Sequence, residues 1–206
     1  PMRAYVTADG DAMAPRVRVN AIGPGPVLPS SRQSDDDFER QASQTPLAHA
    51  VDPAEIADAA ANAKGLFMTA MCLRFWPQWA WLKEAVASGR YGKVLGAHFQ
   101  RIAEPPAWGQ GAYFDGEVSG GGLFDLHVHD TDFVQHVFGK PKSVYSTGFT
   151  KVSGAIDHVL TQYEVDCGAK VSAEGSWAMT PGWGFNMSYR CIFERATADY
   201  DIGRED

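Results

Sequence analysis

The sequence predicts an α+β fold, in which an antiparallel or mixed sheet has helices packed on one face and is preceded by a partial Rossmann-like α/β segment. Four runs rich in β-forming residues follow one another at 143–150, 158–166, 170–178 and 185–196, with short breaks of Gly, Pro or Asp between them. A further run, KVLGAHFQRIA, precedes them and predicts another strand. Successive strands with short connections favour a sheet whose apolar face is covered by helices.

Helix signals lie ahead of this sheet. Residues 79–89, WAWLKEAVASG, form an amphipathic pattern with Pro77 just before it and a glycine at its end. The acidic run 35–37 follows Ser34 and predicts a capped helix start, because carboxylates complement the positive end of the helix dipole. A third helix is expected to begin at Pro53 and to lead into the apolar strand LFMTAMC.

The densest group of reactive side chains lies in residues 119–141, SGGGLFDLHVHDTDFVQHVFGKP. Residues 133–138 carry apolar side chains at helical spacing and stop at Gly139, which is a usual C-terminal signal. A strand would explain only the first part of the segment, so we predict a helix that begins near Phe124. The residues that then share one face, at i, i+4, i+7 and i+11, are Asp125, His129, Asp132 and His136.

Asp125 and His129 form a candidate catalytic pair. A carboxylate one helical turn before a histidine can accept a hydrogen bond from the imidazole, fix its tautomer and favour its protonated form. Such a histidine serves as a general acid or base near neutral pH. The alternative is an ordinary solvated helix face, since i, i+4 pairs are common and weakly stabilising. On that alternative His127 and His136 are surface residues.

A metal site is the second interpretation of the same segment. His127 and His129 in GLFDLHVHD resemble the first-strand motif of the amidohydrolase family, in which an H-x-H pair binds zinc or a related ion. Such a hydrolase needs further ligands at the ends of later barrel strands, and only Asp157 with His158 follows. We therefore rank a metal-dependent hydrolase second and predict no metal ligands.

From Ala61 onward the order of segments resembles the Gfo/Idh/MocA family, which includes glucose-fructose oxidoreductase and inositol dehydrogenase. The segments that carry the resemblance are NAKGLFMTAMCLRFWPQWAWLKEAVASGRYGKVLGAHFQR, SGGGLFDLHVHDTDFV, FGKPKSVYS and AIDHVLTQYEV. In that family a glycine run leads to D-x-x-x-H-x-x-D, whose catalytic aspartate and histidine match Asp125 and His129. The resemblance implies that His129 exchanges the hydroxyl proton of a sugar or polyol, with Asp125 as its partner, while a hydride passes to NAD or NADP. His127 stands where the family usually has glycine and is expected on the substrate side of the pocket.

Three other residues are candidates for substrate binding. Arg74 follows the predicted strand LFMTAMC, and ligands gather at strand ends in α/β units. The alternative for Arg74 is a surface position packed on Trp76. Trp108 and Tyr113 lie in the glycine-rich loop EPPAWGQGAYFDG, which has the composition of a mobile pocket cover. Their alternative is a role as simple anchors of the loop.

Residues 14–60 resemble a different family. The segment APRVRVNAIGPGPVLPSSRQS, followed by DDDFERQASQTPL and DPAEIADAA, is similar to the C-terminal third of a short-chain dehydrogenase. In that family the turn at Pro24 and Gly25 lies beside the nicotinamide, so the resemblance implies that these residues bind the cofactor. The alternative is an ordinary strand end. We expect a chimera-like chain with a partial short-chain-dehydrogenase segment at 1–60 and a C-terminally truncated substrate and oligomerisation domain at 61–206.

Each of the two resembled families requires motifs that are missing from the sequence. No tyrosine is followed by a lysine four residues later, there is no Glu-Lys-Pro segment, and there is no G-x-G-x-x-G. Leu28 fills the third glycine position after Gly23 and Gly25, where a side chain obstructs close helix packing. We therefore expect impaired activity, with a catalytically silent fold or assembly module as the alternative.

Composition restricts the classes of partner. Hydrophobic residues make up 45% of the chain, which is enough for a core, and the net charge of -7 with scattered basic residues excludes a concentrated nucleic-acid footprint. Apolar stretches are far shorter than the roughly 20 residues of a membrane span. No basic-then-apolar leader opens the sequence, so we expect a cytoplasmic protein that binds no membrane. The three cysteines lack metal-binding spacing and are expected to be free thiols.

One face of the last predicted strand is strongly apolar. Phe185, Met187 and Tyr189 alternate there with polar residues, so a helix or a partner must cover them. The family resemblance implies that the open face of the sheet builds the interface of a homo-oligomer.

Overall fold

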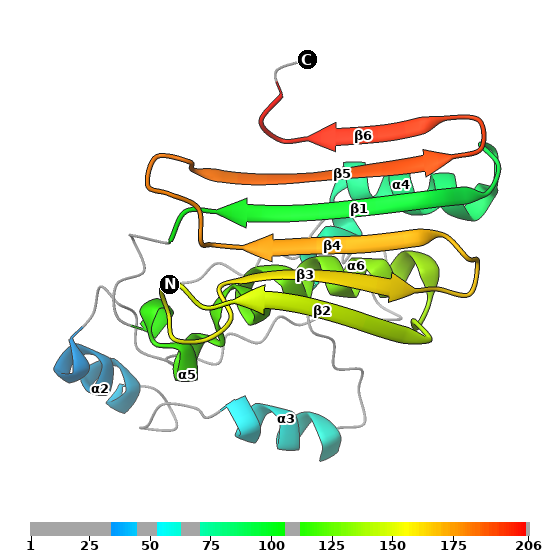
Figure 1. Cartoon of the computed structure of the whole chain (residues 1–206). Helices are drawn as coiled ribbons and strands as arrows, with labels where there is room; N and C mark the ends of the chain where they lie inside the picture. Colours follow the sequence, from blue (N-terminus) through cyan, green and yellow to red (C-terminus); the bar gives the residue numbers. More distant parts are fainter. Residues whose placement is uncertain (1–33, 45–52, 63–70, 106–111, 205–206) are drawn as a thin grey trace. The chain divides into compact units, whose positions relative to one another are not determined.

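The computed structural model describes residues 34–44, 53–62, 71–105 and 112–204 (Figure 1). The chain divides into two compact units, Pro1–Met68 and Thr69–Asp206. The first unit contributes two described helices, α2 (Asp35–Ser43) and α3 (Pro53–Asn62). The Ser34 hydroxyl accepts a hydrogen bond of 3.2 Å from the Asp37 amide, which confirms the predicted cap. The predicted strand near residue 20, with its turn at Pro24 and Gly25, lies outside the described residues.

The second unit is built on a six-stranded sheet in the order β2-β3-β4-β1-β5-β6 (Figure 1). Strand β1 pairs in parallel with β4, and all other neighbours are antiparallel. The sheet is therefore mixed, and the predicted α+β class is confirmed for this unit. The strands are β1 (Val94–Ala103), β2 (Ser143–Phe149), β3 (His158–Glu164), β4 (Lys170–Ser176), β5 (Phe185–Phe193) and β6 (Thr197–Asp201).

Five of these strands follow the sequence prediction, whereas β6 was not predicted. Its five residues, TADYD, place only Ala198 and Tyr200 toward the core, which is too short an apolar alternation to predict a strand, and they pair with β5. Strand β1 comes first in the chain but lies between β4 and β5 in the sheet. Its pairing with β4 is the single parallel one.

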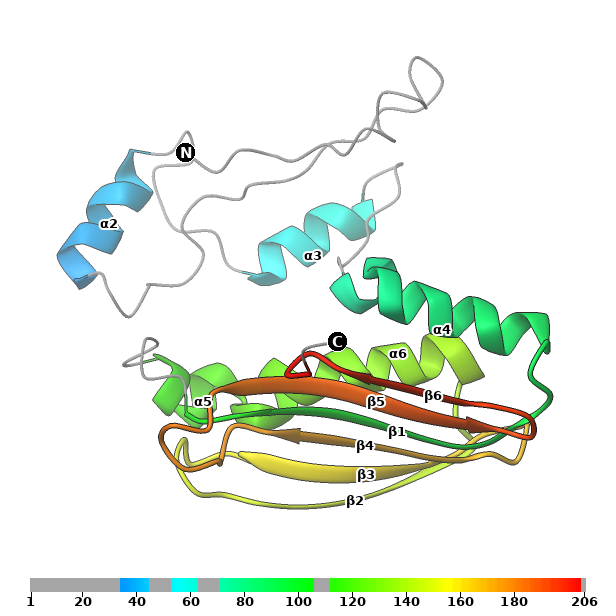
Figure 2. The ribbon, with the colours of Figure 1, turned by 90° about the horizontal axis from the view of Figure 1, so that it is seen from above.

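Helices cover one face of the sheet (Figure 2). The predicted helix after Pro77 is confirmed as α4 (Pro77–Ser88), and it ends where Gly89 adopts φ 63° in the left-handed region. Helix α6 (Val128–Phe138) follows a π-helical turn, η3 (Leu123–His127). The shorter elements are η1 (Cys72–Phe75), η2 (Ala112–Phe114) and α5 (Gly116–Ser119). The strand expected at LFMTAMC falls mostly outside the described residues, and its last residue, Cys72, belongs to η1.

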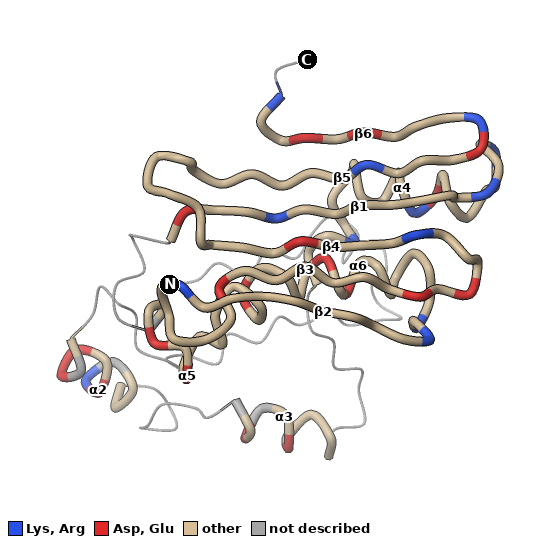
Figure 3. Tube along the Cα trace, in the orientation of Figure 1, with Lys and Arg blue, Asp and Glu red and all other residues tan. Residues whose placement is uncertain are grey.

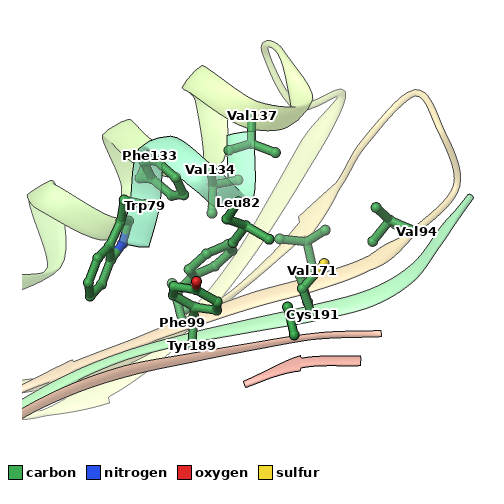
Figure 4. Packing of buried hydrophobic residues seen from close by; sticks show 14 of the residues in the cluster. Trp79, Leu82, Val94, Phe99, Phe133, Val134, Val137, Val171, Tyr189 and Cys191 are labelled. Atoms are coloured by element: carbon green, nitrogen blue, oxygen red, sulfur yellow. The ribbon is translucent and has the colours of Figure 1, made fainter. Parts of the chain in front are cut away.

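The hydrophobic core lies between these helices and the sheet (Figure 4). Trp79 of α4 is fully buried, and its ring makes edge contacts with Phe133 of α6 and with Tyr189 of β5. Phe99 of β1 packs edge-on against Phe133 with 5.7 Å between ring centroids, so one aromatic cluster joins both helices to the middle of the sheet.

The apolar face predicted on the last long strand is covered by helices of the same unit at Met187 and Tyr189, whereas Phe185 stays half-exposed. Met187 and Tyr189 are buried, and the Tyr189 hydroxyl donates a 3.0 Å hydrogen bond to the Gln78 carbonyl of α4. The opposite face carries polar cross-strand pairs such as Gln100 with Glu174 and Arg190 with Asp199. Acidic and basic residues are interspersed along the sheet (Figure 3). Within the described residues, the helices are too short or too polar to cross a membrane.

Candidate active site

The glycine run at 120–122 serves close packing against the loop at 150–157. A Cβ on Gly121 would lie 2.5 Å from the Ile156 carbonyl oxygen, and one on Gly122 would lie 2.6 Å from that of Asp157. The Leu123 amide donates to the Ile156 carbonyl at 3.1 Å. Only glycine allows the two backbones to approach this closely, so the run fixes where the following helix begins.

Asp157 holds that loop in place. Its buried carboxylate accepts hydrogen bonds from the amides of Lys151, Val152 and Ser153, from the Ser153 hydroxyl and from the Trp177 indole. Burial opposes ionisation of Asp157, but these hydrogen bonds outweigh it and hold its pKa at about 2. The ionised carboxylate therefore anchors the loop against which the glycine run packs.

The segment from Leu123 to Phe138 is helical, as predicted, but its first turn is a π-helix. A π-turn inserts an extra residue into the helical ladder and is frequent at functional sites. Its last residue, His127, packs so closely on β4 that a Cβ on Gly175 would lie 2.5 Å from the His127 Cβ. The turn thereby directs His127 toward the sheet, while Asp125 and His129 remain half-buried on another side.

Asp125 and His129 interact through their charges. Burial raises the pKa of Asp125, although the neighbouring His129 and Arg101 charges oppose the rise. Burial also lowers the pKa of His129, as does the charge of Arg101, while Asp125 and Asp132 favour the imidazolium. Within the described residues His129 Nδ1 has no hydrogen-bond partner, so this atom does not donate to the Asp125 carboxylate. The carboxylate acts on the imidazole through space.

A second acid and a cation lie beneath this pair. Asp130 of α6 is fully buried, and its Oδ2 accepts a 3.2 Å hydrogen bond from Nε of Arg101 on β1. Burial raises the pKa of Asp130 to about 6, even though Arg101 favours the carboxylate. Neither residue was a sequence candidate. The sequence held one signal, Arg101 itself. It stands two residues after Phe99 and therefore falls on the same inward face of β1 as the apolar Ala97 and Phe99.

Arg74 is exposed, as its surface alternative expects, and it is paired with Asp132. Its guanidinium contacts both carboxylate oxygens of Asp132, with Nε 2.8 Å from Oδ2 and Nη2 2.5 Å from Oδ1. The arginine is exposed on η1 and ties that turn to α6. Its charge is therefore already paired, which leaves it at the margin of the site.

Tyr113 lies close to the pair, on η2. Burial raises the pKa of its hydroxyl, and the Asp125 charge adds to the rise, so the two side chains are within electrostatic reach. Its ring lies 6.0 Å from that of Trp177. Trp108, Pro24 and Gly25 fall outside the described residues, so their predicted roles remain predictions.

His127 lies in the core and does not line the substrate side, in contrast to the expectation from sequence. It is 3% exposed, and its Nε2 lies 2.8 Å from the Thr161 hydroxyl and 3.3 Å from that of Tyr163. Burial lowers the pKa of His127 to about 4, so it stays neutral. These contacts point His127 at β3 and argue against an H-x-H metal pair. Across the described residues, no three His, Cys, Asp or Glu side chains gather as a metal site would require.

The comparison with protein families decides the ancestry of the second unit. Residues 79–199 match the GFO/IDH/MocA C-terminal domain family. The chain belongs to the GFO/IDH/MocA family. The match includes strands β1 to β5, the start of β6, helix α6 and the Asp125–His129 segment. Among curated proteins, nothing matches the chain.

Solved structures share the GFO/IDH/MocA fold. Levoglucosan dehydrogenase in complex with NADH and levoglucosan is 18% identical, with a TM-score of 0.62 over 72% of this chain and 44% of that one. A probable dehydrogenase from Thermotoga maritima is 22% identical, with a TM-score of 0.60 over 74% and 47%. A myo-inositol dehydrogenase from Corynebacterium glutamicum is 20% identical, with a TM-score of 0.58 over 84% and 47%. The chain thus spans less than half the length of these GFO/IDH/MocA structures.

The glycine run at 120–122 does not fit a dinucleotide phosphate site. A phosphate site needs free backbone amides at a glycine-rich helix start. In the glycine run the Gly120 amide donates to Gly116, the Gly121 amide to Ser119 and the Leu123 amide to Ile156. The loop at 150–157 fills the space that the glycines leave open. This run therefore cannot cradle the pyrophosphate.

The burial of His127 predicts a loss of stability in acid. Its pKa is about 4 in the folded chain against an ordinary 6.5, so below pH 6.5 the unfolded chain binds a proton that the folded chain does not. Through this residue the free energy of unfolding is expected to fall by about 3 kcal/mol between pH 7 and pH 4, and to level off below pH 4. Urea unfolding of the chain and of His127→Gln measures this share, because glutamine can bond the same hydroxyls and does not titrate. A stability difference between the two chains that is equal at pH 7 and pH 4 would contradict a buried neutral His127.

Proposed function

We propose that this chain carries the substrate side of an NAD(P)-dependent dehydrogenase that acts on a hydroxyl group of a sugar or polyol. The observation that carries the proposal is the placement of Asp125 and His129, half-buried and within electrostatic reach of each other, after the close-packed glycine run. The family match supports it, and so does the fold shared with a levoglucosan dehydrogenase that binds NADH and levoglucosan.

His129 is the proposed acid–base group. Because burial and Arg101 lower its pKa, the imidazole is neutral near pH 7 and can accept the proton of a substrate hydroxyl. Asp125 and Asp132 then stabilise the imidazolium that forms. The nicotinamide, when bound, supplies the hydride acceptor. The chain's own residues orient the hydroxyl and move its proton.

The cofactor side of the proposal rests on the first unit. Residues 14–60 resemble a short-chain dehydrogenase segment, and Pro24 with Gly25 would lie beside the nicotinamide of NAD or NADP. We propose that any cofactor binding by this chain involves that segment, because the glycine run of the second unit is filled by the chain itself.

A second candidate function is a catalytically silent assembly module. The filled glycine run favours it, since within the described residues this run offers the dinucleotide no phosphate cradle. On this alternative the Asp125–His129 segment retains its fold without turning over a substrate.

Cofactor binding and a matched pair of variants separate the two candidates. We expect saturable quenching of nicotinamide fluorescence when the chain is titrated with NADH or NADPH, and polyol-dependent reduction of NAD or NADP over a panel including myo-inositol and levoglucosan. His129→Gln is expected to lower this rate by at least about 100-fold, as loss of a general base does. Because the pKa of His129 is lowered, kcat/KM of the unmodified chain should decline in acid only below pH 6.5.

His136→Gln is the control, because it removes a histidine from the same helix without touching the proposed pair. It should keep the full rate. Absence of saturable binding at millimolar cofactor would contradict the catalytic proposal and leave the assembly module. Equal losses in the two variants would contradict the role of His129.

We further propose that a second copy of the chain covers the open face of the sheet. No described helix of the second unit lies over this face, and its residues form polar pairs, among them His98 with Ser172 at 2.9 Å and Asn186 with Asp201 at 2.7 Å. In protein interfaces a polar, hydrogen-bonded rim surrounds a more apolar core, and these pairs fit such a rim.

Sedimentation equilibrium tests the homo-oligomer. The chain is expected to sediment as a multiple of its 22.4 kDa mass. Ser172→Lys places a charge on the open face and should shift the mass toward a single chain, whereas Gln135→Lys on the exposed side of α6 should not. A single-chain mass for the unmodified protein would contradict the proposal.

A further inference from the structure

Strand β2 forms one edge of the six-stranded sheet (Figure 1). Every residue of this strand, SVYSTGF, is exposed. Val144 is 60% exposed, Tyr145 67% and Phe149 50%. Because Val144 and Tyr145 are neighbours in a strand, their side chains point to opposite faces of the sheet. Strand β2 is therefore open on both faces as well as along its edge.

This edge is held as a regular strand. From Ser143 to Phe149, β2 pairs antiparallel with β3 in one unbroken register. The Ser146 Oγ lies 2.8 Å from the Thr161 Oγ1, and the Ser143 hydroxyl donates a 2.7 Å hydrogen bond to Glu164. In an antiparallel pair every second residue turns its amide and carbonyl away from the neighbouring strand. Within the described residues no strand takes up the groups that β2 turns outward.

Strand β2 lacks the features that commonly keep an edge strand from pairing. Such edges are short, carry charged residues or proline, or are bent by a bulge. The β2 residues include no charge and no proline, and their pairing with β3 has no register shift. The other edge, β6, has five residues, of which Asp199 and Asp201 are acidic. One sheet thus has a charged edge at β6 and an uncharged, regular edge at β2.

We infer that β2 pairs antiparallel with the β2 of a second copy of the chain, so that two six-stranded sheets join edge to edge. The inference concerns the edge of the sheet and not its open face. It goes beyond the proposed dehydrogenase function and does not depend on it.

The composition of β2 suits a copy of itself. Because the strand carries no charge, its antiparallel copy sets no like charges opposite each other. Two strands of equal length satisfy each other's outward amides and carbonyls, and the contact closes because it uses the same edge of both copies. The same arrangement of β6 about Tyr200 would set Asp199 opposite Asp201 of the second copy, which is unfavourable.

Hydrogen exchange of single amides in β2 tests the inference on the unmodified chain. At high chain concentration we expect amides throughout β2 to be protected. On dilution every second amide should lose protection, because the amides that point away from β3 are covered only by the second copy. The β1–β5 ladder should keep its protection at both concentrations.

Thr147→Lys and Thr197→Lys form a matched pair of variants. Thr147 of β2 pairs with Leu160, and Thr197 of β6 pairs with Ile192, so the pair places one lysine on each edge of the sheet. Both threonines are exposed. Thr147→Lys is expected to halve the mass of the assembly in sedimentation equilibrium, because lysine on an edge strand opposes pairing. Thr197→Lys is expected to leave the mass unchanged.

Ser172→Lys separates the edge from the open face. Ser172 lies on β4, and β3 stands between β4 and β2. Protection of the outward β2 amides should persist in this variant at high chain concentration. A failure of the open-face interface would therefore leave the result for the edge standing.

Three results would overturn the inference. One is free exchange of the outward β2 amides at both concentrations, which would mean that no strand covers this edge. Another is protection that persists on dilution in a chain of single mass, which would assign the cover to another part of the same chain. The third is an unchanged mass in folded Thr147→Lys. Because the exchange measurement needs no variant, misfolding of Thr147→Lys would leave the inference open to refutation by the first two results.

Discussion

The carboxylate of Asp157 is the constraint on which the candidate site depends. It collects hydrogen bonds from three successive amides, a hydroxyl and the Trp177 indole, and it is fully buried. A buried charge is tolerated only when its partners surround it, so the loop that supplies these donors can adopt one shape. That shape presents the carbonyls of Ile156 and Asp157 to the glycine run, and the backbone of the run packs directly against these two carbonyls.

The Asp125–His129 segment takes its geometry from this contact. Because the glycine run fixes where the helix begins, the first turn is a π-turn that sends His127 into the core and leaves Asp125 and His129 together on another side. The buried Arg101–Asp130 pair holds the same helix to β1 from below. The pKa of His129 is thus set by burial and by neighbouring charges, and its Nδ1 makes no hydrogen bond to Asp125.

Sequence patterns predicted the elements better than they predicted the site. The helix after Pro77 and the five longer strands follow from apolar periodicity and from Gly or Pro punctuation, which are local properties. The helix of the catalytic segment was also predicted, but its π-turn depends on a close approach to a loop some thirty residues later in the chain. Periodicity cannot report such a contact, and the expected place of His127 came from the family resemblance alone. The role of Asp157 was hidden in the same way, because its donors meet it only in the folded chain.

Hydrogen exchange in Asp157→Asn tests the central claim that this carboxylate holds the catalytic segment in place. Replacing one carboxylate oxygen by an amide nitrogen puts a donor where the chain supplies donors. We expect amides at 151–153 and at Leu123 to lose protection, and those from 124 to 129 with them, while the β1–β5 ladder keeps its protection. Unchanged protection at Leu123 and through His129, with loss confined to 151–153, would contradict the claim.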